Sequence, residues 1–85
     1  MIPETGRSAA VSPEQTSAVR SMADLARVVR QMHDDLVGSG EQEWENPTLE
    51  GFLEALAAVA EDRVSPDAPT WAHLAELLVA ATGYE

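Results

Sequence analysis

Large apolar residues recur at helical spacing in three stretches of the chain. In the first stretch they follow one another at steps of four, three and four residues: Leu25, Val29, Met32 and Leu36. These steps place the side chains on one stripe of a helix. They predict a helix over residues 22–37, with Ser21 as its N-cap. We expect residues 38–40, Gly-Ser-Gly, to end this helix, because glycine adopts a left-handed C-cap conformation at no steric cost.

The second stretch predicts a helix over residues 47–62. Proline suits the first helical position, and it keeps the residue before it out of the helical region. Asn46 is therefore the predicted N-cap, with Thr48 as the alternative. The buried side of this helix is expected to comprise Leu49, Phe52, Leu53, Leu56, Val59 and Ala60.

The third stretch predicts a helix over residues 71–82, with Thr70 as its N-cap and Gly83 as its C-cap. Apolar residues cover more than half of its circumference. Such a helix is usually buried on more than one side, so it is either the central helix of three or part of a subunit interface. In the second case, a homodimer through this helix would bury Leu77 and Val79.

Residues 1–20 contain proline, glycine and serine with few large apolar side chains, and we interpret them as a mobile tail. Residues 12–15, Ser-Pro-Glu-Gln, have the pattern of a capping box and predict one short helical turn within it. Residues 21–85 form a single predicted domain. The predicted fold class is all-α, a small three-helix bundle with a mobile N-terminal tail. Its expected core is Leu25, Val29, Met32, Leu36, Leu49, Phe52, Leu53, Leu56, Trp71, Leu74 and Leu78.

Composition narrows the classes of function. A chain of 85 residues can bury only a small core. It contains no cysteine, no apolar run long enough to cross a bilayer and no apolar segment of the kind a secretory signal needs, so we expect a cytoplasmic protein without a membrane partner. Its net charge of −10 would repel a phosphate backbone, which argues against nucleic acid as a partner.

The negative charge is concentrated in one half of the chain. Residues 41–62 include seven acidic residues and no basic one. This surface either keeps the protein soluble or docks a basic protein, as an acidic inhibitor, immunity protein or adaptor would. Trp44 is expected either in the core or as a partly exposed anchor among glutamates. The predicted partner-binding residues are Glu41, Glu43, Trp44, Glu45, Glu50, Glu54 and Glu61.

The sequence suggests no cofactor, metal site or catalytic centre. His33, Asp34 and Asp35 project in different directions from a helix and cannot converge on one ion. His73 and Glu76 share a helix face but lack a third ligand. We therefore expect a non-catalytic binding module. The alternative is a small enzyme or ligand-binding subunit with a site at a dimer seam near His73 and Glu76.

Two blocks of sequence carry a resemblance to a known family. They are residues 44–56, Trp-Glu-Asn-Pro-Thr-Leu-Glu-Gly-Phe-Leu-Glu-Ala-Leu, and the segment from Trp71 to the closing Tyr84-Glu85. On these blocks the chain resembles a family of small acidic bacterial proteins of unknown function, over about residues 21–85. The resemblance implies a helical fold and no mechanism.

Overall fold

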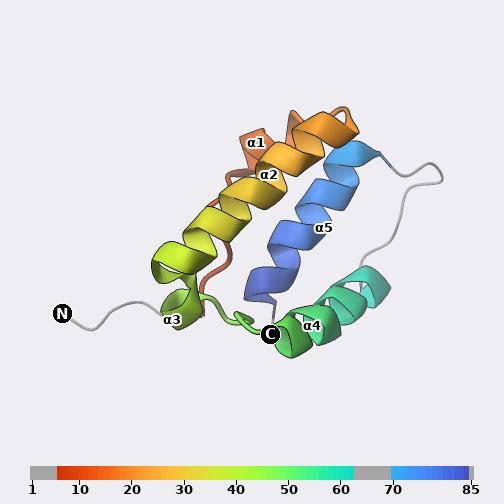
Figure 1. Cartoon of the computed structure of the whole chain (residues 1–85). Helices are drawn as coiled ribbons and strands as arrows, with labels where there is room; N and C mark the ends of the chain where they lie inside the picture. The colour runs from red at the N-terminus through yellow and green to blue at the C-terminus, as the bar shows by residue number, and fades with distance from the viewer. Residues whose placement is uncertain (1–5, 63–69, 85) are drawn as a thin grey trace.

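The computed structural model describes residues 6–62 and 70–84, and helices dominate this part of the chain (Figure 1). In chain order they are α1 (Pro13–Ser17), α2 (Met22–Asp35), a π-helical turn η1 (Leu36–Gly40), α3 (Glu41–Glu43), α4 (Leu49–Asp62) and α5 (Trp71–Gly83). The described residues contain no strand, only one isolated bridge between Arg7 and Trp44. The predicted all-α fold class is confirmed. The described part of the chain includes no helix with the length and apolarity that a membrane crossing requires.

Helix α5 lies between the other long helices and packs against α1, α2 and α4 (Figure 1). Its buried residues Ala75, Val79 and Ala81 have small side chains, which allow neighbouring helices to approach closely. Burial on more than one side explains the broad apolar surface of this helix. The homodimer through this helix stays a prediction; of its two expected seam residues, Val79 is buried within the chain and Leu77 packs partly buried against the core between α4 and α5.

The predicted mobile tail is wrong for residues 6–20. Ala9, Val11, Thr16 and Val19 are all buried, although each contributes little apolar area. The Ala9 amide donates a hydrogen bond of 2.7 Å to the buried Thr82 hydroxyl of α5. Residues 6–11, which we call the N-terminal strap, thus cross the end of α5 and complete its burial. Residues 1–5 of the predicted tail lie outside the described residues.

Three of the predicted helix starts are confirmed. Ser12 and Gln15 form the capping box of α1, and the hydroxyls of Ser21 and Thr70 accept hydrogen bonds from the third residues of α2 and α5. The start of α4 differs from the first expectation. There the Thr48 hydroxyl accepts from the Gly51 amide at 3.1 Å, whereas the side chain of Asn46 is bonded elsewhere.

Of the glycines expected to end helices, only Gly83 stands at a helix end, directly before the C-cap Tyr84. Gly38 and Gly40 lie inside η1, through which the chain continues into α3, and Gly83 is the last residue of α5. Among described residues only Gly6 has a positive φ, of 80°. Gly83 is needed for space instead, because a Cβ there would lie 2.9 Å from the backbone of Ser8 in the strap.

The predicted core is only partly correct. Met32 is buried, and five further residues pack against the core while partly exposed: Leu25, Leu36, Phe52, Leu56 and Leu78. The others are exposed: Val29, Leu49, Leu53, Trp71 and Leu74. The helices meet through smaller residues such as Ala55, Val59 and Ala75, and Val59 is completely buried. Because these small contacts set the helix positions, the larger side chains lie at the edges of the contacts.

Candidate functional site

Two of the seven predicted partner-binding residues are engaged inside the protein. The Trp44 side chain is only 8% exposed, and its indole N–H donates a hydrogen bond of 2.7 Å to the Asp35 carboxylate. The Glu43 carboxylate accepts a 2.7 Å hydrogen bond from the Arg7 guanidinium. The interpretation of Trp44 as an exposed anchor is therefore wrong, and Glu43 already has an internal partner.

Asp35 is the centre of this internal network. Its carboxylate accepts hydrogen bonds from the Arg7 guanidinium at 2.8 and 3.1 Å, from Trp44, and from the Ala10 amide at 3.0 Å. The Arg7 hydrogen bonds, followed by those from Trp44 and Ala10, lower the pKa of Asp35 from 3.8 to about 2 despite partial burial. The same pairing raises the pKa of Arg7. The network holds the N-terminal strap and Trp44 against the end of α2.

The other five predicted partner-binding residues are exposed: Glu41, Glu45, Glu50, Glu54 and Glu61. None takes part in the ion pairs found among residues 6–62 and 70–84. Glu50, Glu54 and Glu61 lie within about 40° of one another around α4, since successive residues of an α-helix are about 100° apart. Their charges are thus presented together to solvent.

A hollow beside α4 brings Glu45 and Glu54 to one place on the surface. Gly51, Ala55 and Ala58 line it with small side chains, and Asn46 and Tyr84 complete the lining. Helix α4 supplies Glu54 and the small residues, whereas Glu45 comes from the segment between α3 and α4. The sequence predicted the two glutamates as part of one face but gave no sign of the hollow between them.

The position of Glu45 depends on hydrogen bonds of Asn46. The Asn46 side-chain amide donates to the carbonyls of Ala81 at 2.9 Å and Tyr84 at 2.7 Å, and its backbone amide donates to the Thr82 carbonyl at 2.9 Å. These bonds fasten the segment before α4 to the end of α5. The Tyr84 hydroxyl in turn donates to the Asp62 carboxylate at the end of α4. The hollow is therefore built on anchored backbone.

This arrangement suits a cationic side chain. Carboxylates at the rim can accept hydrogen bonds from an ammonium or guanidinium group, and charge-assisted bonds of this kind are the stronger class. The methylene stem of a lysine or arginine can lie along apolar surface while its charged head stays at the edge. Alanines and a glycine provide such a surface in the hollow.

The alternative pair, His73 and Glu76, is not brought into one hollow. His73 lines a hollow with Arg20, Trp71 and Leu74, whereas Glu76 lines another with Pro13 and Val79. In the part of the chain that the structure describes, no three histidine, aspartate or glutamate side chains are grouped as a metal ion would require.

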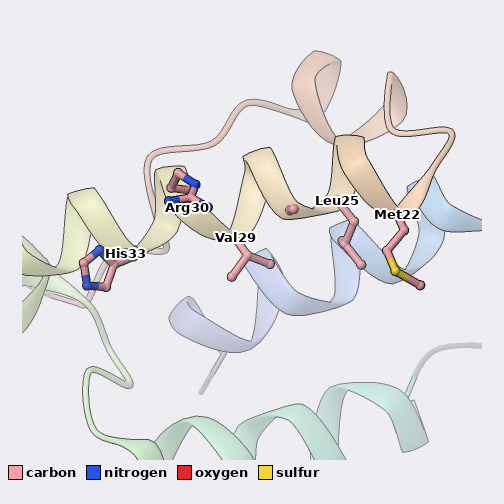
Figure 2. Close-up of a pocket in the computed structure, with 6 residues that line it drawn as sticks. Met22, Leu25, Val29, Arg30 and His33 are labelled. Carbon is pink, nitrogen blue, oxygen red and sulfur yellow. The ribbon is translucent and has the colours of Figure 1, made fainter.

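A second surface feature lies on the opposite flank of α4 and was not predicted. Leu49 and Leu53 of α4 are 72% and 53% exposed, and Met22 and Val29 of α2 are 69% and 44% exposed. Figure 2 shows Met22, Leu25 and Val29 projecting from α2 toward the side on which α4 lies. The sequence marked most of these residues as apolar positions of a helix stripe. Periodicity alone could not tell that the stripe is open to solvent.

Comparison with known proteins adds a family and no function. The model of a family described as "Family of unknown function (DUF7660)" matches residues 21–85. No curated protein and no solved structure matches the chain.

Proposed function

The chain belongs to DUF7660, a family of unknown function, and from its own geometry we propose that it is a small three-helix bundle serving as a non-catalytic protein-binding module. Its docking surface is the acidic side of α4, and its partner is a basic protein. The observation that carries the proposal is the hollow that Glu45 and Glu54 line together with the small residues Gly51, Ala55 and Ala58.

The charge distribution supports a basic partner. The acidic side chains of α4 have no basic counterpart in the ion pairs of the described residues, so their field extends into solvent. Glu50 and Glu54 repel each other across one helical turn by about 0.2 to 0.5 kcal/mol. A cationic partner would replace this repulsion with attraction and would associate faster because of electrostatic steering.

The hollow adds a geometric requirement to the charge. A lysine or arginine of the partner inserts between the two glutamates, with its stem on Ala55 and Ala58. Glu41, Glu50 and Glu61 do not line the hollow and act mainly on the rate of association. The proposed module thus distinguishes a partner with one protruding basic side chain from a partner that is merely positively charged.

The test uses the full chain and a fluorescein-labelled, arginine-rich helical peptide as the probe, with binding followed by fluorescence anisotropy. Glu45→Gln combined with Glu54→Gln should weaken binding about tenfold, which corresponds to about 1.4 kcal/mol. The matched control is Glu14→Gln combined with Asp34→Asn, which removes the same charge from exposed positions elsewhere. It should weaken binding less than about twofold, since exposed charges are screened beyond about 10 Å at 0.1 M salt.

Equal weakening by the two double variants would show that only net charge matters, and the site between Glu45 and Glu54 would be abandoned. Absence of peptide binding by the wild-type chain at low salt would reject a docking role for the acidic side of α4.

A further inference from the structure

Large apolar side chains are exposed on two helices that form one face of the molecule. One hollow on this face is lined by Met22, Leu25, Val29 and neighbouring residues of α2. An adjoining hollow runs from α2 to the start of α4, where Leu49 and Phe52 line it. Val29 and His33 line both hollows, so the apolar surface is continuous between the two helices. We call it the α2–α4 groove.

The two walls of the groove carry opposite charges. On the α2 side the apolar stripe is bordered by Arg30, and on the α4 side it is bordered by Glu50; both residues are exposed. Arg30 directly follows the exposed Val29, and Glu50 directly follows the exposed Leu49. Neither Arg30 nor Glu50 takes part in an ion pair among the described residues. We call the side of Arg30 the basic edge and the side of Glu50 the acidic edge, although the exposed Asp34 lies one turn after Arg30 on α2.

From this pattern we infer that the α2–α4 groove is the interface of a symmetric homodimer, in which α2 of one copy lies along α4 of the other. Helices α2 and α4 run in opposite directions on this face (Figure 1). A two-fold axis parallel to the groove places the basic edge of each copy over the acidic edge of its partner. Val29 and Leu49 then meet across the interface twice, as do Arg30 and Glu50, because a two-fold contact is self-complementary.

Charge selects this arrangement over the other two-fold packing of the same faces. An axis across the groove would place α2 against α2 and α4 against α4, so that arginine meets arginine and glutamate meets glutamate. Like charges held together across an interface are strongly unfavourable. An axis parallel to the groove brings together residues that lie at the same height along it. Val29 of α2 and Leu49 of α4 are at the same height, since both line one hollow with Phe52.

Burial in the dimer interface also explains why leucine and valine occupy positions that are exposed in a single chain. A chain this small gains little from its own core, and oligomerisation is a common source of additional stability. This interface lies on the flank of α4 opposite the hollow of Glu45 and Glu54, so a dimer leaves that hollow open. Glu50 is shared by the two proposals, but Glu45 and Glu54 lie outside the dimer interface, so the test on the hollow and the test on the dimer can fail separately.

Sedimentation equilibrium on the full chain tests the homodimer through charge reversal. The wild-type chain should form a dimer at micromolar concentration. Arg30→Glu alone and Glu50→Arg alone should each weaken the dimer by at least about tenfold, because each reversal acts at two symmetric places. The two reversals combined in one chain should restore the dimer, and so should an equimolar mixture of the two single variants.

The combined variant separates the two symmetric arrangements. If α2 met α2 and α4 met α4, the wild type and all three variants would bring like charges together, so the single reversals would not weaken the dimer and the combined variant would restore nothing. Failure of this rescue, with the single variants folded by circular dichroism, would overturn the proposed interface.

A second variant tests the apolar part of the contact. Leu49→Ser combined with Leu53→Ser changes side chains that are exposed in one chain, so the helix content should be unchanged while the dimer is lost. Leu74→Ser, at an exposed leucine of α5 that lines neither hollow of the groove, is the control and should leave the dimer intact. A wild-type chain that sediments as a 9.1 kDa monomer up to about 100 µM would overturn the homodimer and leave the groove to a helix of a different protein.

Discussion

Asp35 shows how much of this small fold depends on a single carboxylate. It receives hydrogen bonds from Arg7 and Ala10 of the strap and from Trp44 beyond α3, so it joins three segments that are far apart in sequence. The carboxylate is partly buried, and a partly buried group of this kind is costly to leave without partners. The same network withdraws Trp44 from the surface.

We predict that Asp35→Asn lowers the free energy of unfolding by about 2 to 3 kcal/mol at pH 7, because the amide cannot pair with the guanidinium. The wild-type carboxylate has a pKa of about 2 in the folded protein against 3.8 ordinarily, so its stabilisation is present above about pH 4. That stabilisation is lost as the pH falls from about 4 through about 2, and the difference between wild type and variant should shrink over this range.

Urea unfolding of both chains at several pH values measures this difference. Asp34→Asn is the control, because Asp34 is exposed beside Asp35 and has only a distant contact with His33 at 3.6 Å. An Asp34 variant as unstable as the Asp35 variant would contradict the central role of Asp35.

At the scale of single elements, the helices were predicted more reliably than their buried faces. The N-caps Ser21 and Thr70 act locally, so the sequence was sufficient to place them. Val59 is buried as expected, but the buried face of α4 is rotated toward Ala55 and away from Leu49 and Leu53. Hydrophobic periodicity cannot separate these faces in a helix with so many apolar residues.

The role of a glycine also depends on tertiary contacts that local sequence does not show, and substitutions at Gly83 and Gly38 test this. A Cβ at Gly83 would lie 2.7 Å from the Ser8 Cβ and 2.9 Å from its backbone, so we predict that Gly83→Ala displaces the strap and costs about 1 to 3 kcal/mol. A Cβ at Gly38 would meet no atom within 4 Å, and the residue is helical. Gly38→Ala should therefore be neutral or stabilise by up to about 1 kcal/mol.

Thermal or urea unfolding of the two glycine variants decides between a packing role and a helix-ending role. If Gly83→Ala is as stable as wild type, the close contact between the strap and α5 is not present in solution. A marked loss of stability in Gly38→Ala would instead indicate that this glycine is needed for the turn.

At the scale of the whole molecule, the family region is not self-contained. The family match begins at residue 21, yet Ala9, Val11, Thr16 and Val19 belong to the same hydrophobic core as Val28 and Ala75 or lie beside it. The strap also provides the donor for the Thr82 hydroxyl and the guanidinium for Asp35. Residues 6–20 therefore complete the domain.

We predict that a chain beginning at Ser12 loses about 2 to 4 kcal/mol of unfolding free energy, since it lacks the Arg7 network and the burial of Ala9 and Val11. A chain beginning at Gly6 retains every contact described here and is the control. Urea unfolding measures the loss, and the fluorescence of Trp44 should shift to longer wavelength in the shorter chain. Equal stability of the two chains would show that the strap does not stabilise the fold.

The sequence by itself determined the helical fold class, the three long helices, most of their N-caps and the acidic character of the second half of the chain. Each of these follows from local spacing, capping chemistry or composition, which act within a few residues. The family resemblance over residues 21–85 was likewise carried by contiguous blocks and is confirmed by the family match.

Only the tertiary structure decided which apolar residues are buried, that the strap covers α5, and that Trp44 is internal while Glu45 and Glu54 share a hollow. These features depend on contacts between residues far apart in sequence, such as Arg7 with Asp35 and Asn46 with Ala81. Small side chains set how closely the helices pack, and that closeness determines which larger side chains are left in solvent. No local pattern encodes that distance, so the same leucines that predicted the core are found at the α2–α4 groove.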